Sequence, residues 1–308
     1  MKLKKALSSA AIRLASRLER PLVRLVYPDG TQASDFLAPA GEPALLDVDS
    51  TAWRVMANPV SLLVGGVTAV LLELAEPRVR SGVWEHTAFR SRPLQRLQRT
   101  GYAAMMTAFG ARSRAEDMIA RINAGHARIA GRTPAGVAYV ASDSDLLTWV
   151  HATATFGFLE GYANCVRQVD ANSRDRFYAD NQASARLYGV SAPPACAQDF
   201  DDLLNVMLPE LEASEIVLEF LAVMRSVPLM PVLLRPLQSL LIRAAVQNLP
   251  AVVRERLGLA GAPWRVAPWQ WRVLRAIGRA VDGLPLPSLP EVLARRRVAA
   301  PRALSPLG

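Results

Sequence analysis

The three histidines are the residues of this chain whose type and spacing could support metal chemistry. His86, His126 and His151 fall within 66 of the 308 residues. A buried imidazole needs a partner for its ring nitrogens, which can be a carbonyl, a carboxylate or a metal. Two buried histidines only 25 residues apart favour a metal site, while histidines satisfied by hydrogen bonds within the core are the alternative.

Helical spacing predicts that two of these histidines point inward. His126 follows Ile119 by seven residues and Ile122 by four, which places it on the apolar face of a predicted helix. His151 lies four residues after Leu147, in a predicted helix that is apolar nearly all round. Both imidazoles are therefore expected in the core.

A stripe of arginines lies in the helix predicted to begin at Pro93. Arg92, Arg96, Arg99 and Thr100 are spaced i, i+4, i+7 and i+8, so they share one face. Guanidinium groups beside an apolar core can clamp carboxylates in a bidentate manner. The alternative is a solvated face that pairs with nearby acids.

Other common chemistries have no support in the sequence. No GxSxG nucleophile motif, phosphate-binding glycine loop or HExxH motif occurs. The pair Gly65-Gly66 lies inside a helical stretch and predicts close packing. Cys165 and Cys196 are the only cysteines, and they form neither a disulfide framework nor a zinc motif. We interpret them as buried apolar residues in a reducing cytoplasm.

The elements that must position these residues are helices, because strand-type alternation is almost absent. We predict an all-α fold with one main domain at 46–283, between a basic N-terminal extension at 1–45 and an irregular Pro/Arg-rich tail at 284–308. Ser113 is expected to open a capping box, and Asp143 and Ser173 are expected to cap later helices. The predicted helices are 58–75, 93–109, 113–130, 144–168, 173–189, 199–207, 214–225, 235–248, 250–257 and 268–280.

The positive charge of the chain gathers at its two ends. The net charge is +9, yet residues 1–25 hold seven Lys/Arg and one acid, and residues 254–308 hold ten Arg and three acids. A nucleic-acid binder would carry a basic face on its folded body, so nucleic acid is not an expected partner. Basic ends suit an anionic membrane or another acidic partner. Plain solvated termini are equally consistent.

The N-terminal sequence starts like a signal peptide, but Arg13 and Arg17 interrupt the apolar stretch. We therefore expect a cytoplasmic protein, with peripheral membrane contact through the basic ends as an alternative. Residues 55–72 carry no charge, but Pro59 and the glycine pair lie inside this stretch. It is interpreted as a buried core helix and not as a membrane span.

Several phrases together resemble the MpaB-type oxygenases, a family that includes the bacterial latex-clearing proteins. The likeness spans roughly residues 50–280, and its specificity lies in the order and number of the phrases. The matching phrases are Trp53-Arg54-Val55 with Asn58-Pro59, Leu62–Leu74, Pro77-Arg78-Val79, Gly82–Arg90, Arg96–Gly101, Phe109-Gly110, His126–Gly131, Thr133–Gly136, Trp149–Thr153 and Leu187–Val190.

This resemblance implies a globin-like helical core that holds haem b. The latex-clearing members have an axial histidine that follows an Arg-x-x-Lys-Thr phrase, and this chain has Arg96-x-x-Arg99-Thr100. Arg99 stands where the lysine would, and it has no lone pair to give a metal. An open or water-bound distal position lined by Arg96, Arg99 and Thr100 is therefore implied. His126 is the best match for the proximal iron ligand.

The other residue roles follow from the same resemblance. His151 is the alternative iron ligand, His86 beside Glu85 is expected on the distal side, and Arg92 with Arg96 would meet the haem propionates. The implied activity is oxygenation of an apolar organic substrate with O₂. A small or prenylated substrate is favoured over rubber. The remaining alternatives are a haem-binding sensor or carrier without catalysis, and a cofactor-free protein that binds a membrane surface.

Overall fold

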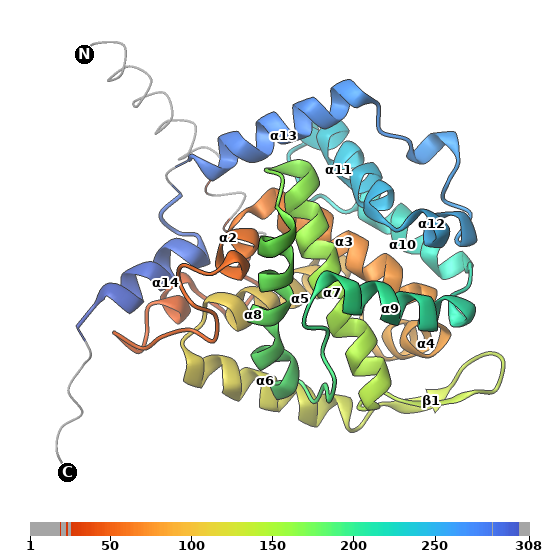
Figure 1. The fold of residues 1–308 in the computed structure, drawn as a ribbon, viewed down its shortest axis with the longest axis horizontal. Helices are drawn as coiled ribbons and strands as arrows, with labels where there is room; N and C mark the ends of the chain where they lie inside the picture. Colours follow the sequence, from red (N-terminus) through yellow and green to blue (C-terminus); the bar gives the residue numbers. More distant parts are fainter. Residues whose placement is uncertain (1–18, 20–22, 24–25, 285, 302–308) are drawn as a thin grey trace.

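A computed structural model describes residues 19, 23, 26–284 and 286–301 of the chain (Figure 1). The predicted all-α class is confirmed, because helices make up almost all of the regular structure. The globin-like arrangement of the core remains a prediction. The helices are α2 (Thr51–Ala57), α3 (Pro59–Ala75), α4 (Pro77–His86), α5 (Pro93–Phe109), α6 (Arg112–His126), α7 (Ser144–Cys165), α8 (Ala171–Leu187), α9 (Ala197–Met207), α10 (Glu215–Ser226), α11 (Arg235–Asn248), α12 (Ala251–Arg256), α13 (Pro268–Asp282) and α14 (Pro290–Ala299), with 3-10 turns η1 (Ala33–Phe36), η2 (Leu208–Glu210), η3 (Val232–Leu234) and η4 (Ala262–Trp264).

Local capping explains where the central helices begin. The Asn58 side chain accepts hydrogen bonds from the first turn of α3, and Asp143 does the same for α7, as predicted. Two predicted caps are wrong. The helix α6 begins at Arg112 with no side-chain cap, so Ser113 lies inside it, and α8 is capped by Asp170 three residues before Ser173. In α8, the Asp170 carboxylate binds a free amide at the start of the helix, a role that the sequence pattern predicts for Ser173.

Several elements were not predicted. They are the helices α2 and α4, a small hairpin, and α14, which lies in the tail predicted to be irregular. In the hairpin, β1 (Ala130–Arg132) pairs antiparallel with β2 (Ala138–Val140), and Gly131 lies opposite Tyr139. Gly136 takes a positive φ of 84° in the connecting turn, a conformation that favours glycine.

The antiparallel helices α3 and α7 form the centre of the molecule (Figure 1). Gly65 faces the backbone of Gly157, and a Cβ on Gly65 would lie only 2.6 Å from the Gly157 carbonyl oxygen. Farther along, the Trp149 indole donates to the carbonyl of Leu72 at 3.3 Å. Gly65 is therefore a close-packing position, as the sequence predicted.

The remaining helices cover this pair. The helix α11 packs along α3, where the Thr68 hydroxyl donates to the Ala245 carbonyl. The helix α13 crosses α7, and Gly278 lies directly on the Cys165 carbonyl. Cys165 is buried and Cys196 is half-buried, and neither forms a disulfide.

A buried arginine joins two segments from opposite parts of the chain. Arg297 of α14 is only 1% exposed. It donates to the carbonyls of Phe36, Glu42 and Phe109. The helix α14 therefore packs beneath the segment around η1 and against the end of α5.

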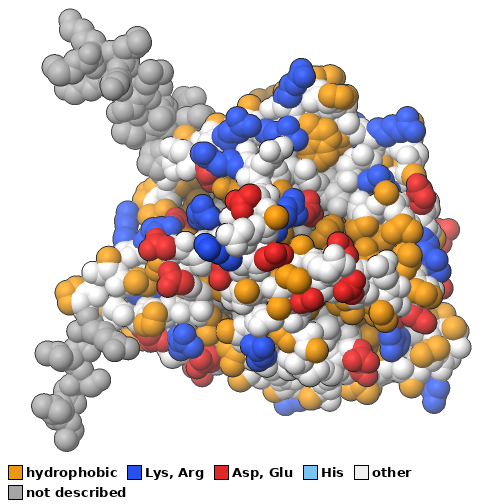
Figure 2. Space-filling model, in the orientation of Figure 1, with side chains coloured by type: hydrophobic (Ala, Val, Ile, Leu, Met, Phe, Trp, Pro, Cys, Tyr) orange, Lys and Arg blue, Asp and Glu red, His pale blue; other side chains and the backbone are white. Residues whose placement is uncertain are grey.

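The view in Figure 2 shows basic and acidic side chains intermixed over one face of the molecule. Within the described residues, no single helix is long and apolar enough to cross a membrane, and only α2 and α3 pass that test together, with a bend of 95° between them. Residues 1–18, which include the stretch that starts like a signal peptide, lie outside the described residues.

Candidate active site

The histidines of α6 and α7 share one feature. Each ring is half-buried, and the Nδ1 atom of each is fully buried without a hydrogen-bond partner. Burial lowers the pKa of His151 to about 4. The pKa of His126 is also lowered, by burial and then by the positive charge of Arg96. Both rings are therefore neutral at physiological pH, which is the form that binds a metal.

Glu73 and Arg96 bring charge to this region. Glu73 is the only charged residue of α3. Burial raises its pKa to about 7, and the Arg96 guanidinium opposes that rise. Arg96 is half-buried on α5, and its charge acts on both Glu73 and His126. The helices α3, α5 and α6 therefore direct polar groups toward a common region.

The central helix pair is only half-buried along one strip. On α3, Gly66, Val70 and Glu73 are half-buried and share a helical face. On α7, His151 and Phe158 are half-buried at a spacing of seven residues. A Cβ on Gly66 would lie 3.9 Å from the Phe158 ring, so the two strips are adjacent. His151 therefore lies on the half-buried side of the central helix pair.

The other residues predicted for the site lie nearer the surface. Arg92, Arg99 and Thr100 are exposed, and Thr100 accepts a hydrogen bond from Arg96. His86 is exposed at the end of α4, where its Nε2 atom lies 3.2 Å from the Tyr139 hydroxyl of the hairpin. The predicted arginine face is thus partly buried at Arg96 and open at its other members.

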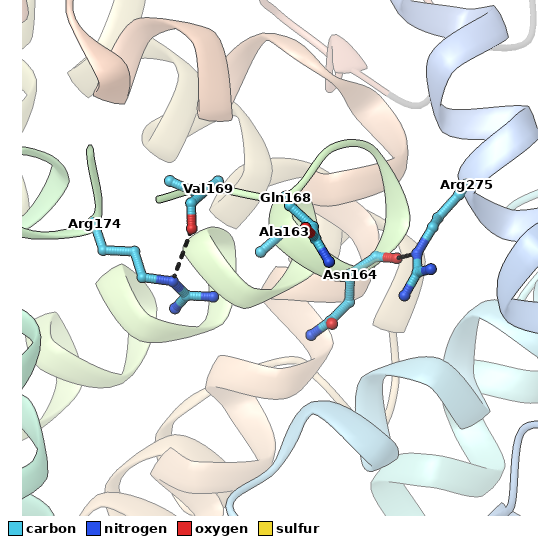
Figure 3. A pocket seen from close by; sticks show the side chains of 6 residues that line it. All are labelled: Ala163, Asn164, Gln168, Val169, Arg174 and Arg275. Atoms are coloured by element: carbon cyan, nitrogen blue, oxygen red, sulfur yellow. Dashed lines mark hydrogen bonds between the residues drawn. The ribbon is translucent and has the colours of Figure 1, made fainter. Parts of the chain in front are cut away.

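A separate polar hollow of about 250 Å³ lies at the opposite end of α7 (Figure 3). Arg275 donates through Nε to the Asn164 carbonyl at 3.1 Å, and Arg174 donates through Nε to the Val169 carbonyl at 3.3 Å. These arginines satisfy carbonyls at and beyond the C-terminal end of α7, which is an ordinary structural role. The hollow contains none of the histidines.

Fold and site together define an all-α protein with two neutral imidazoles whose buried Nδ1 atoms are unpaired, and one of them, His126, lies in the electrostatic range of Arg96. Residues 53–282 match the family described as ER-bound oxygenase mpaB/B'/Rubber oxygenase, catalytic domain, and the chain belongs to this family. The resemblance drawn from the sequence is confirmed. Membership gives the chain a general oxygenase role, with O₂ and a small molecule as substrates. Neither the curated proteins nor the solved structures gave a significant match.

Sequence reasoning missed two polar residues of this region. Glu73 carried a usable signal, since it is a lone charge in a long apolar helix. Asn123 lies one turn before His126, and its side-chain amide donates to the Leu187 carbonyl. Its Oδ1 atom is buried without a partner. Nothing in the local sequence marks Asn123, because its partner comes from α8.

Proposed function

We propose that the chain is a haem b-dependent oxygenase that uses O₂ to oxidise an apolar organic substrate. The observation that carries this proposal is the pair of buried Nδ1 atoms on His126 and His151. Leaving a buried polar atom unpaired is unfavourable. Two such atoms on neutral imidazoles are expected where a ligand supplies the missing interactions.

The residues present fit a haem group. A haem requires a neutral imidazole for its iron, cations for its propionates and an apolar space for its ring. His126 or His151 provides the first, and the arginine face of α5 provides the second. The half-buried strip that contains Gly66 and Phe158 is the proposed place for the third.

His126 is the proposed iron ligand, with His151 as the alternative. His126 lies at the C-terminal end of α6 and in the electrostatic range of Arg96. This proximity suits an iron ligand close to the guanidinium that would meet the propionates. The pKa of His151 is lowered by burial alone, which suits a residue that lines the proposed haem space.

Bound haem would supply the activation of O₂. The chain's own residues would orient the haem and neutralise its carboxylates. Arg96 and the exposed Arg99 and Arg92 offer guanidinium donors to carboxylates, and Thr100 is held by Arg96. Arg99 stays protonated and cannot ligate the iron. Glu73, with its pKa near 7, can hold or release a proton close to neutral pH.

The substrate class follows from the lining. Val70 and Phe158 are half-buried apolar residues of the strip, so a small apolar or prenylated molecule is proposed. The same ligands would serve a haem-binding sensor or carrier, which would bind haem without substrate turnover.

The test is the absorption spectrum of protein produced with a haem precursor. We expect a Soret band in wild type and its loss in His126→Ala, whereas the His86→Ala control retains it because His86 is exposed and paired with Tyr139. Circular dichroism confirms that each variant is folded. Loss only in His151→Ala would move the ligand to α7. A folded wild type that stays colourless after haem addition would refute the proposal.

A further inference from the structure

The turn between α10 and α11 presents apolar side chains to solvent. All six residues from Pro231 to Pro236 are exposed. Val232 is 72% exposed and Leu233 is 92% exposed. A leucine with that exposure contacts almost nothing in its own fold. The turn between α10 and α11 therefore places two large apolar side chains in contact with water.

The sequence around this turn is basic and contains no acid. Residues 220–254 include Arg225, Arg235, Arg243 and Arg254, and they contain no Asp or Glu. Of these, Arg225 and Arg235 are exposed. None of the four arginines forms an ion pair with a described residue. The apolar turn is thus flanked by positive charge without local compensation.

An aromatic residue adds to this surface. The Arg225 guanidinium lies 4.2 Å above the ring of Trp264 in η4, and Arg243 donates to the Arg265 carbonyl. The pKa of Arg225 is lowered by burial and by the charge of Arg243, which places the two guanidiniums close together. Both η3 and η4 contact α11, so that helix links the turn to the segment that carries Trp264.

We infer that this surface, which we call the α10–α11 turn surface, docks onto an anionic lipid bilayer. Exposed Val232 and Leu233 enter the boundary between headgroups and acyl chains, and Arg225 and Arg235 meet the lipid phosphates. A bilayer interface accepts apolar side chains and arginines side by side, and tryptophan is favoured there as well. A bilayer supplies apolar and anionic contacts together, whereas an acidic protein partner would need an apolar pocket placed to receive Leu233.

The first test places a polarity-sensitive fluorophore on the turn. Leu233→Cys is labelled in a Cys196→Ser background of the full chain, since Cys165 is buried. Val206→Cys on α9 is the matched control, because Val206 is a large apolar residue that is 74% exposed outside the turn. With vesicles of phosphatidylcholine and phosphatidylglycerol, we expect a blue shift at residue 233 and none at residue 206.

The second test measures partitioning by vesicle sedimentation. Val232→Ser with Leu233→Ser should weaken binding to the mixed vesicles by roughly ten-fold or more, while Val206→Ser should leave it unchanged. Arg225→Gln with Arg235→Gln should weaken binding to the mixed vesicles and leave binding to pure phosphatidylcholine unchanged.

Three results would overturn the inference. The label at residue 233 could keep its aqueous emission while the protein sediments with vesicles, which would assign binding to another part of the chain. The serine variants could sediment like wild type. The blue shift could arise without vesicles and rise with protein concentration, which would show that the turn meets a second copy. None of these readouts requires haem or turnover.

Discussion

Burial shifts the pKa values of Glu73 and His151 in opposite directions, and each shift favours the neutral form of the side chain. The glutamate pKa rises to about 7 and the histidine pKa falls to about 4. Both groups are thus disfavoured in their charged forms by low polarity around them. Arg96 is the charged group that acts on this region from α5, and burial lowers its pKa as well. The strip beside α3 and α7 is therefore an apolar environment for any ligand.

Glu73 gives a pH prediction for the haem-free protein. Its pKa in the folded protein is about 7, whereas the ordinary value for a glutamate is 4.5, so the unfolded chain releases the proton at a lower pH. Stability is therefore lost as pH rises through this window, by up to about 3 kcal/mol. Glu73→Gln should be more stable than wild type at pH 8 and similar at pH 4, as measured by urea unfolding. Equal pH slopes for the two proteins would contradict the assignment.

For individual residues, part of the candidate site could be predicted from the sequence. The spacing of His126 and His151 placed both on apolar faces, in agreement with their buried Nδ1 atoms. The pKa of Glu73 could not be predicted in the same way, since it depends on burial by helices that lie far apart in the sequence. The roles of the histidines and arginines toward haem remain predictions.

Among the elements, the long helices were predictable and the short ones were not. The bounds of α3 and α5 agree closely with the periodic apolar pattern and its proline starts. The helices α4 and α14 have ten residues each and carry few apolar positions, so their pattern is weak. The hairpin of β1 and β2 has three residues per strand, which is too short for alternation to be recognised. Tertiary packing stabilises these elements.

The crossing of α3 and α7 depends on glycine. A Cβ on Gly157 would meet the backbone of Gly65 and the amide of Ala69. Gly157→Ala should therefore lower the unfolding free energy by about 1–3 kcal/mol through overpacking. Gly101→Ala is the matched control in α5, where a Cβ meets nothing within 4 Å. That control should be neutral or stabilising by up to about 1 kcal/mol.

Thermal or urea unfolding of the two alanine variants decides this point. If Gly157→Ala were as stable as Gly101→Ala, the close approach of the central helices would not hold in solution. The predicted difference concerns backbone spacing alone, since both substitutions add one methyl group to a helix.

Across the whole molecule, Arg297 is the main polar link between distant segments. It donates to the carbonyls of Phe36, Glu42 and Phe109 while fully buried. Burial lowers its pKa to about 10, so the side chain remains charged at neutral pH. Three carbonyls and one guanidinium thus depend on each other for hydrogen bonds.

Arg297→Leu should destabilise the protein by about 3 kcal/mol or more, because it leaves buried carbonyls without donors. Arg296→Leu is the control, since Arg296 is exposed on the same helix, and it should change stability by less than about 0.5 kcal/mol. Urea unfolding gives the two values. Limited proteolysis of Arg297→Leu should also show earlier cleavage near α14, and equal cleavage of both variants would contradict the link.

The position of Arg297 also constrains the order in which the molecule folds. Its hydrogen bond to Phe36 joins residues 261 positions apart, as does the bond from the Tyr27 hydroxyl to the Ser288 carbonyl. Contacts of such separation are slow to form, because the long intervening chain must first be brought into a compact shape. We therefore expect the central helices to assemble before α14 docks beneath η1. A chain in which α14 has not docked would leave that helix and the segment around η1 exposed to proteases.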